Sequence, residues 1–584
     1  MRRKRHQGRM RTLYSSLDGH ESNLIASANT IGTCLETPTI LAPDRRCRSQ
    51  EDNYKIPWTG CSDISDMERR FCIHKALFVL RSPPSMSSPD ASITGRPAHS
   101  LFSRKPITEI DEHKGELKRA LNAWHMIALG IGVIIGAGLF SLTGLAAGDY
   151  AGPAVVISFM IAAIGCGLAG CCYSELASMI PVAGSAYTYS YATLGELVGW
   201  IIGWDLVLEY AVGAATVASS WTSYFKVLLA QFGLALPPRL TASPFSIVEL
   251  ADHSHVHGLI NLPAFIVVVA VSVVLMRGVT GSAWLNAVIV MLKLTIVVLV
   301  IVLGASYVNP ANYVPFIPEN TGEFGHFGLS GVMRGAAVIF FSYVGFDAVS
   351  TAAQEAYNPQ RDVPLGILGS LAICAILYVG FGLVLTGIVN YQELGSMVDK
   401  MAPISTAISR TPYAWLKSAI YVGILCGYTT VVLVLLMGQS RVFYSMASDG
   451  LLPAIFARVH PQWRTPWLTN LLFMIFAGLM AAFVPGSWLG EATSIGTLLA
   501  FILVCIGVMV LRRTDPDRPR RFRTPFVPLV PLVGILFCGA MMLSLDIWTW
   551  VRLIVWLIIG LVVFFGYSRK RSLLARQAAM NEVG

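Results

Sequence analysis

The sequence predicts an all-α integral membrane protein, and three observations support this fold class. The chain of 584 residues is 54% hydrophobic and only 13% charged, whereas a soluble domain carries roughly 25% charged residues. Apolar runs of about 20 residues, the length that crosses a bilayer, recur from Trp124 to Phe565. Two of these runs are interrupted by glycine or acidic residues, at 130–138 and 340–347. The net charge of +9 does not indicate nucleic-acid binding, because the arginines lie mainly in the N-terminal region and between the apolar runs.

Composition divides the chain into three parts. Residues 1–112 are polar, rich in Arg, Ser and Pro, and without hydrophobic periodicity, which predicts a disordered cytoplasmic tail and no secretory signal. A translation start at Met86 is an open alternative, in which 1–85 is a start-site artefact. Residues 113–567 are expected to form one membrane domain, and 568–584 a cytoplasmic C-terminal tail.

The apolar runs predict about twelve spans. A short amphipathic helix at 116–121 is expected to lie on the membrane surface before the first of them. The spans are expected near residues 124–147, 152–180, 195–230, 260–276, 284–307, 330–356, 364–389, 413–440, 467–484, 490–511, 525–546 and 548–567.

Basic residues are divided unequally between the two sets of loops. The loops on one side of the membrane contain few basic residues, mainly Arg239, Lys400 and Arg410. The loops and tails on the other side contain many more: Lys114, Lys118, Arg119, Arg277, Arg361, Arg441, Arg458, Arg464, the arginines of 512–523, Arg569, Lys570 and Arg571. Because Lys and Arg accumulate on the cytoplasmic side of a membrane, we expect both termini in the cytoplasm, which an even number of spans requires.

The first apolar run contains four glycines within Gly130–Gly138. Glycine is a poor helix former, and it lets the backbone leave helical geometry and lets a ligand approach closely. We therefore expect the helix to break near Ile134–Gly138 and to resume at Ala137 or Gly138, with free N–H groups that suit an anion. A continuous helix that uses these small residues for close packing is the alternative.

The sixth apolar run carries the second interruption, at 340–347, with Gly345 and Asp347 in mid-membrane. Irregular backbone at membrane depth is tolerated only where it is buried in protein or lines a cavity. The first and sixth spans are the first members of two successive groups of five spans. Interrupted helices at such corresponding positions are typical of transporters with inverted repeats.

Several longer motifs make the chain similar to a known family. They are Gly132–Gly138, Tyr173–Tyr189, Gly203–Tyr210, Phe341–Thr351 with Asn358–Pro364, and Gly438–Gly450. With these motifs, residues 113–567 resemble the amino acid–polyamine–organocation (APC) superfamily of permeases, and within it the cationic amino acid transporter family and its bacterial relatives. The resemblance implies a leucine-transporter-like 5+5 inverted repeat with two further helices. It also implies amino acid transport, which protons drive in many relatives.

An amino acid zwitterion needs an anion site beside a cation site. We expect backbone N–H groups of the first interruption to bind the carboxylate, and carbonyl groups of both interruptions to accept from the ammonium. The N–H groups are those of Gly136, Ala137 and Gly138, and the carbonyl groups are those of Ile134, Phe341, Ser342 and Val344. The substrate side chain is expected to point toward spans 3, 6 and 8. For Phe341 and Ser342, helix packing alone is the alternative.

Lys293 lies deep in the fifth apolar run. A charged lysine near the bilayer centre is costly and needs a partner or a task, and because burial disfavours its charged form, we expect Lys293 to exchange a proton. The resemblance implies that proton-driven relatives have a lysine at this point of span 5, at the position where sodium-driven members bind sodium. Its ammonium is then expected to bridge spans 1, 5 and 8. A lysine that snorkels to the cytoplasmic face is the alternative.

Three acids within or beside apolar runs are singled out as candidates. Glu209 in span 3 is expected to take part in proton coupling by meeting Lys293 or a substrate ammonium. Asp347 in span 6 is expected to be a second acidic counterpart, or else to satisfy freed N–H groups of the broken helix. Glu175, near the cytoplasmic end of span 2, is expected to be structural or to form an inner gate with nearby arginines.

No cofactor, metal site or disulfide framework is predicted. The 11 cysteines include no C-x-x-C pair and no regular spacing. His253, His255 and His257 alternate beside Asp252, and histidines in such a pattern can bind zinc. No cysteine or further carboxylate completes that site in the sequence.

The leading hypothesis is a secondary active amino acid transporter that works by proton symport and alternating access. An exchanger or uniporter, and a non-transporting sensor or accessory subunit, are the alternatives. An enzyme is not expected, since no nucleotide-binding loop, H-E-x-x-H or G-x-S-x-G motif occurs. The expected partners are an amino acid, protons and membrane lipid, with neutral and cationic substrates both open. A small single-span subunit would leave no mark in this sequence.

Overall fold

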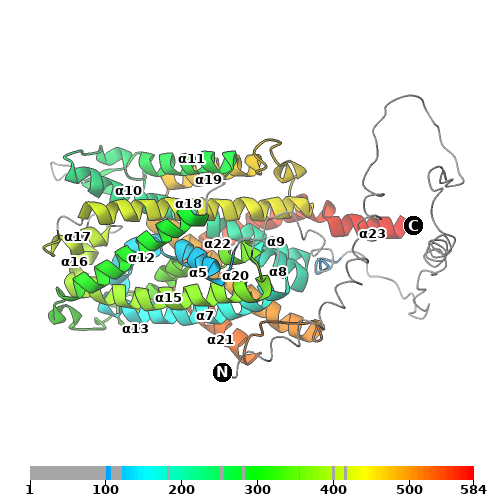
Figure 1. Cartoon of the computed structure of the whole chain (residues 1–584), viewed down its shortest axis with the longest axis horizontal. Coiled ribbons are helices and arrows are strands. Elements are labelled where there is room, and N and C mark those ends of the chain that lie inside the picture. The colour runs from blue at the N-terminus through cyan, green and yellow to red at the C-terminus, as the bar shows by residue number, and fades with distance from the viewer. Residues whose placement is uncertain are drawn as a thin grey trace, which may run out of the picture. The chain divides into compact units, whose positions relative to one another are not determined.

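The computed structural model describes residues 100–106, 121–180, 184–249, 255–278, 283–353, 356–397, 402–413 and 417–583, and most of them are helical. Figure 1 shows the helices running alongside one another, with α16 and α17 at one end and α23 at the other. The membrane-embedded part is therefore an all-α bundle, as the sequence predicted.

The first half of the bundle extends to α12. Its elements are α5 (Ala123–Ile134), the π-helix η1 (Gly138–Leu142), α6 (Thr143–Ala146), the π-helix η2 (Ala147–Ala151), η3 (Gly152–Ala154), α7 (Val155–Met179), α8 (Ser185–Thr193), α9 (Glu196–Val207), the π-helix η4 (Leu208–Val212), α10 (Gly213–Gln231), η5 (Pro238–Leu240), β1 (Ile247–Glu249), β2 (His255–His257), α11 (Leu262–Arg277) and α12 (Ala283–Ala305).

The second half begins with a short 3-10 helix. Its elements are η6 (Pro310–Tyr313), α13 (Gly328–Ile339), η7 (Phe340–Tyr343), α14 (Ala348–Thr351), α15 (Pro359–Ile388), α16 (Tyr391–Ser396), α17 (Pro403–Ser409), α18 (Lys417–Ser448), η10 (Ala454–Ala457), α19 (Trp467–Phe483), α20 (Gly486–Thr514), α21 (Leu529–Leu543), α22 (Ile547–Gly566), η11 (Ser568–Lys570) and α23 (Leu573–Val583).

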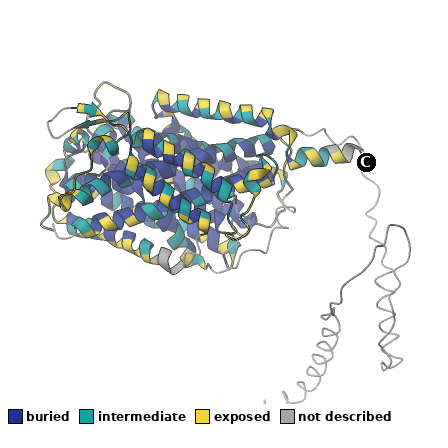
Figure 2. Cartoon of the chain, turned by 90° about the horizontal axis from the view of Figure 1, so that it is seen from above, coloured by how far each residue is buried: buried dark blue, intermediate teal, exposed yellow. Residues whose placement is uncertain are grey.

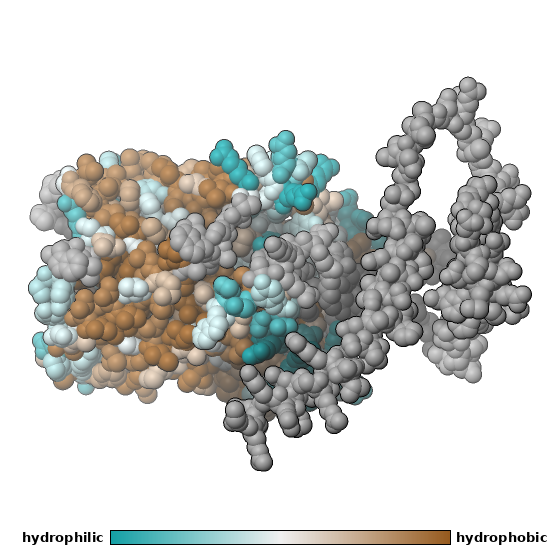
Figure 3. Space-filling model, in the orientation of Figure 1, coloured by the Kyte–Doolittle hydropathy of each residue, from teal (hydrophilic) through white to brown (hydrophobic). Residues whose placement is uncertain are grey.

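Long apolar helices make the chain a multi-pass membrane protein. Among the described residues, eight continuous helical stretches are long and apolar enough to cross a membrane, and α5, α11, α19 and α21 are shorter apolar helices. The surface seen in Figure 3 is mostly hydrophobic over the helices, with hydrophilic residues gathered toward the ends. An apolar belt with polar ends is the surface that a bilayer requires.

Several helix ends differ from the predicted spans by a few residues, among them the start of α15 and the end of α18. α15 starts at Pro359 rather than near residue 364, because proline fits the first turn of a helix. α18 continues to Ser448 rather than ending near residue 440. Hydropathy marks where the apolar stretch ends, whereas a helix continues until a residue such as Gly450, which has a φ of +77°, ends it.

Helix packing brings the first and fifth predicted spans together. α15 packs along α7 and α5, α18 packs along α10, and α12 crosses α5, α15 and α18. Figure 2 shows the buried residues facing one another inside the bundle and the exposed ones on its outer ridges. Lys293, the residue of α12 that contacts α5, therefore lies in the protein interior.

Glu175 lies in an ionic cluster at the end of α7. Its carboxylate accepts hydrogen bonds from Arg512 Nε at 2.8 Å and from the Thr524 N–H at 2.8 Å. Arg520 Nε lies 3.3 Å from the same carboxylate, and both side chains are buried. The cluster fastens α7 to α20 and to the connection between α20 and α21. Contacts with nearby arginines are what a structural role and an inner gate would both require.

Of the predicted tail, the structure describes residues 100–106. The backbone of 101–103 accepts hydrogen bonds from the first N–H groups of α9. Lys105 Nζ lies 2.6 Å from Asp449 Oδ1, and the other oxygen of that carboxylate accepts from the Tyr187 hydroxyl at 2.8 Å. All but the last residue of the predicted surface helix lies outside the described residues.

The strands β1 and β2 form an antiparallel hairpin in which Ile247 pairs with His257. His255 and His257 lie on β2, while His253 and Asp252 lie outside the described residues. Over the part of the chain that the structure describes, no three His, Cys, Asp or Glu side chains are placed to hold a metal ion.

Candidate functional site

The first apolar run is interrupted where its glycines predicted. α5 ends at Ile134, Ile135 is extended with φ −72° and ψ 100°, and helical structure resumes at Ala137 and Gly138. Outside the bonds internal to helices, the N–H groups of Gly136, Ala137 and Gly138 donate to no backbone carbonyl of the described residues. Free N–H groups at the start of a helix are suited to bind an anion.

The second interruption follows α13. The chain passes through η7 to Val344, which is extended with φ −58° and ψ 139°, and α14 begins at Ala348. Gly345 between them has a φ of +104°. Glycine adopts that conformation without steric cost, so it lets the backbone turn out of the helix here.

The two interruptions face each other across close backbone contacts. A methyl group added at Gly138 would overlap the backbone of Ser342, and one added at Gly345 would overlap the Val133 side chain. Small residues at both points therefore permit the approach. The seven residues expected to bind substrate are all buried at these two interruptions: Ile134, Gly136, Ala137, Gly138, Phe341, Ser342 and Val344.

Tyr378 of α15 spans the gap between the two interruptions. Its hydroxyl oxygen lies 2.8 Å from the Ile134 carbonyl oxygen and 2.9 Å from the Ser342 carbonyl oxygen. A hydroxyl has one hydrogen to donate, so the two carbonyls share it. These are two of the carbonyls expected to accept from a substrate ammonium.

The contacts nearest to Gly213, beside the second interruption, are made by carbon atoms. The nearest atoms to a methyl group placed on Gly213 would be Cγ2 of Thr493 at 3.4 Å, Cδ1 of Leu435 at 3.7 Å and Cε2 of Phe341 at 3.7 Å. Gly213 begins α10, while Leu435 lies on α18 and Thr493 on α20. Three helices and η7 thus meet here through carbon atoms.

Lys293 lies where α5, α12 and α18 meet. Its Nζ donates to the Gly132 carbonyl oxygen at 2.6 Å, and the side chain is 1% exposed. Gly427 of α18 leaves room for it, because a methyl group there would lie 2.8 Å from the Lys293 Cε. The ammonium of Lys293 therefore contacts span 1, while the carbon atoms of its side chain pass Gly427 of span 8. The side chain does not reach the surface as a snorkelling lysine would.

The buried acids form a separate group. Glu209 lies beside Asp347 and Asp205, and no carboxylate lies near Lys293 among the described residues. Asp347 accepts hydrogen bonds from the hydroxyls of Ser185, at 2.9 Å, and Tyr210. The N–H group of Ala348, the first residue of α14, also lies within hydrogen-bonding reach of the Asp347 carboxyl. The structure thus brings Glu209 to Asp347 and not to Lys293, and the contact with Ala348 is of the kind expected if Asp347 satisfies N–H groups of the broken helix.

The two helix interruptions, Lys293 and the buried acids together could bind a zwitterion and carry protons. Free N–H groups and carbonyl oxygens stand on facing backbone segments, which suits the two ends of a zwitterion. A buried ammonium and a group of buried carboxyls flank them, and both are groups that can carry a proton.

A family model described as "Amino acid permease" matches residues 121–571. This range includes both interruptions, Lys293 and the acidic group. The chain belongs to the amino acid permease family.

Curated relatives cover nearly the whole length of the match. This permease is 43% identical over 478 residues to the branched-chain amino acid permease BcaP of Bacillus subtilis. The aligned region covers 81% of this chain and 99% of that protein. The permease is 42% identical over 477 residues to the methylthioribose transporter of the same organism, with the same coverage. It is 36% identical to the vacuolar cationic amino acid transporter 4 of Arabidopsis thaliana, over 72% of this chain and 68% of that protein.

Sequence reasoning missed two side chains of this permease. Asp205 is 1% exposed, and neither of its carboxyl oxygens has a partner among the described residues. Its spacing of four residues from Glu209 puts both acids on one helix face, and that spacing is a signal that the sequence offers. Tyr378 gives no such signal, because a tyrosine within an apolar run does not tell which carbonyls its hydroxyl reaches.

Proposed function

We propose that this permease is a secondary active transporter that moves amino acids across the cell membrane by alternating access, with protons as the coupling ion. The observation that carries the proposal is the pair of facing helix interruptions, with Lys293 Nζ bonded to a carbonyl of the first. We further propose the leucine-transporter-like arrangement of about twelve spans, with both termini in the cytoplasm. Interrupted helices in corresponding halves and the distribution of basic residues support it.

The substrate carboxylate binds the N–H groups of Gly136, Ala137 and Gly138 in this proposal. The ammonium binds carbonyl oxygens of Ile134 and of η7, where the Tyr378 hydroxyl now lies. Tyr378 keeps these carbonyls satisfied without substrate, since buried unpaired carbonyls are costly. When the substrate ammonium binds, it replaces the Tyr378 hydroxyl at one of the two carbonyl oxygens, those of Ile134 and Ser342.

The coupling proton resides on Lys293 in one part of the cycle. Its ammonium neutralises carbonyls at the end of α5, where the helix carries partial negative charge. Loss of the proton would release α5 from α12 and α18. Glu209 and Asp347 are suited to hold a second proton between them, because neighbouring buried carboxyls titrate as a pair.

The relatives are named for three kinds of substrate, so similarity alone leaves the class open. Atoms near Gly213 are apolar, and they come from Phe341, Leu435 and Thr493. An apolar wall gives no charge to balance a lysine or arginine side chain. We therefore propose a neutral, apolar amino acid as the substrate.

Uptake into proteoliposomes tests this function. Purified protein would be supplied with labelled leucine, alanine or arginine, each with and without an inward proton gradient. Gradient-dependent accumulation of leucine or alanine is expected. Preference for arginine would contradict the substrate class, while uptake that responds only to internal amino acid would make the protein an exchanger.

A further inference from the structure

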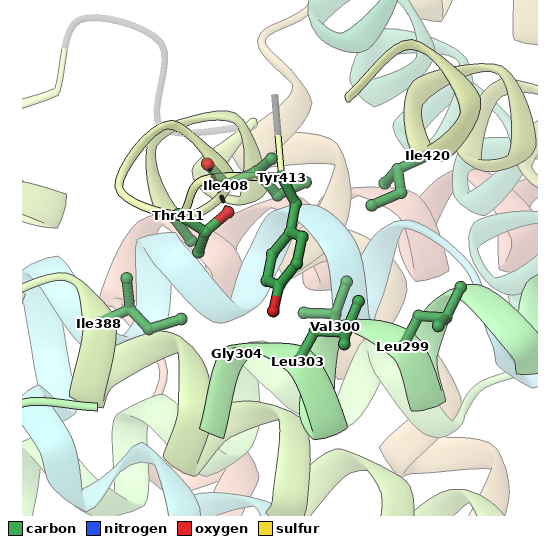
Figure 4. A pocket seen from close by; sticks show the side chains of 10 residues that line it. Leu299, Val300, Leu303, Gly304, Ile388, Ile408, Thr411, Tyr413 and Ile420 are labelled. Carbon is green, nitrogen blue, oxygen red and sulfur yellow. Dashed lines mark hydrogen bonds between the residues drawn. The ribbon is translucent and has the colours of Figure 1, made fainter. Parts of the chain in front are cut away.

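An open groove runs between four elements at the α16–α17 end of the bundle. Its accessible space is about 30 Å³, and its walls come from α12, the end of α15, α17 and the start of α18. Figure 4 shows the ring of Tyr413 pointing into it toward Leu303 and Gly304. The Thr411 hydroxyl donates to the Ile408 carbonyl oxygen at 2.8 Å, so almost only carbon faces the groove.

The depth of the groove places it at the edge of the bilayer. One wall is α12, whose neighbouring residue Val302 is 61% exposed on an apolar helix that faces lipid. Tyr307 and Tyr413 stack edge to face at the end of that helix, with ring centroids 5.9 Å apart. Tyrosines of membrane proteins concentrate at the membrane–water interface. The groove therefore runs from that interface into the hydrocarbon layer, where its occupant must be apolar.

A basic residue lies near residues that line the groove. Lys417 lies one turn before Ile420, which lines the groove. Its Nζ donates to the Ser409 hydroxyl at 3.4 Å and forms no ion pair within the described ranges. Arg410 nearby is already engaged by Glu393. The ammonium of Lys417 is thus available to an anion at the interface.

We propose that this groove binds an anionic phospholipid, with one acyl chain along the carbon-lined wall and the phosphate at Lys417. Charge complementarity selects the lipid, because the Lys417 ammonium attracts a headgroup with net negative charge more strongly than a zwitterionic one. The site joins α17 to α12, so the bound lipid fastens the α16–α17 end to the helix that carries Lys293. It does not depend on the transported substrate.

Native mass spectrometry of the full chain tests the lipid site. Delipidated protein would be given equal amounts of phosphatidylglycerol and phosphatidylcholine with identical acyl chains. About fivefold more phosphatidylglycerol than phosphatidylcholine is expected to stay bound. Lys417→Gln is expected to bring that ratio to about one, while Lys417→Arg keeps it.

A second pair of variants tests the groove itself. Leu303→Trp fills the groove and is expected to lower retention of both lipids, whereas Val302→Trp on the neighbouring exposed position leaves it unchanged. All variants must unfold at the wild-type temperature to be compared. Equal retention of the two lipids by the wild type, or full retention by Leu303→Trp, overturns the proposal. So does a small membrane protein that co-purifies with the wild type and is lost from Leu303→Trp.

Discussion

Lys293 puts one ammonium group against the last turn of α5. The Gly132 carbonyl that it contacts lies two residues before the helix ends at Ile134. Carbonyl groups at a helix C-terminus lack intrahelical partners and carry partial negative charge. A buried cation is costly on its own, and this placement offsets part of that cost without a carboxylate.

Replacing Lys293 by methionine tests the proton role. Methionine fills the space but carries no proton, so gradient-driven uptake is expected to fall at least about tenfold, while counterflow of labelled substrate persists. Uptake assays in proteoliposomes measure both, and Lys570→Met on the exposed surface is the control. Undiminished gradient-driven uptake by Lys293→Met would show that the lysine does not couple protons.

Gly138→Ala tests the contact between the two interruptions. The added methyl group would overlap the Ser342 backbone, and overpacking of this kind costs about 1–3 kcal/mol. We expect thermal unfolding at a lower temperature and a loss of uptake. Gly167→Ala is the matched control, since a methyl group there meets nothing within 4 Å. Identical behaviour of the two variants would contradict the close approach.

At the scale of elements, the end of α7 is held by an ionic cluster as well as by apolar packing. Glu175 is 1% exposed, and Arg520 beside it is almost as deeply buried. Removing one partner of a buried ion pair leaves the other charge uncompensated. Glu175 is therefore the one carboxylate in the described chain that pairs with both Arg512 and Arg520 at the α20–α21 connection.

Glu175→Gln is expected to lower the free energy of unfolding by about 3 kcal/mol. The measurement is thermal unfolding of the protein in detergent. Glu393→Gln removes the exposed pair with Arg410 and is expected to cost less than about 1 kcal/mol. If both variants unfold alike, the buried cluster does not fasten α7 as described.

At the scale of the whole molecule, Asp449 joins segments from distant parts of the chain. Its carboxylate holds Lys105 and the Tyr187 hydroxyl, and its carbonyl accepts from the Leu573 N–H at 3.0 Å. The segment 100–106, α8, the end of α18 and the C-terminal region are therefore fastened at one residue.

Asp449→Asn is expected to loosen that junction. The Glu196 and Leu197 N–H groups, which donate to backbone carbonyls of 101–103, should then exchange hydrogen faster, since segments with fewer contacts open more often. Hydrogen exchange followed by mass spectrometry measures this rate. Asp546→Asn at the start of α22 is the control, and unchanged exchange in Asp449→Asn would mean that the segment is held by its backbone alone.

The sequence by itself determined the features that depend on short stretches of chain. Apolar runs predicted the membrane helices, because crossing a bilayer demands length and low polarity from each segment alone. The glycines of 130–138 and Gly345 predicted the two interruptions, because glycine changes the backbone locally. Lys293 was singled out because a charge inside an apolar run needs an explanation wherever its neighbours lie.

Only the tertiary structure decided which of these segments meet. The Tyr378 hydroxyl reaches Ile134 across 244 positions of sequence, and Arg512 reaches Glu175 across 337. Glu209 was paired with Lys293 as one expectation, yet it lies beside Asp347. Helix periodicity tells which face of a helix is apolar but not which helix covers it. Partner choice depends on how all the helices pack at once, and no single stretch of this chain contains that information.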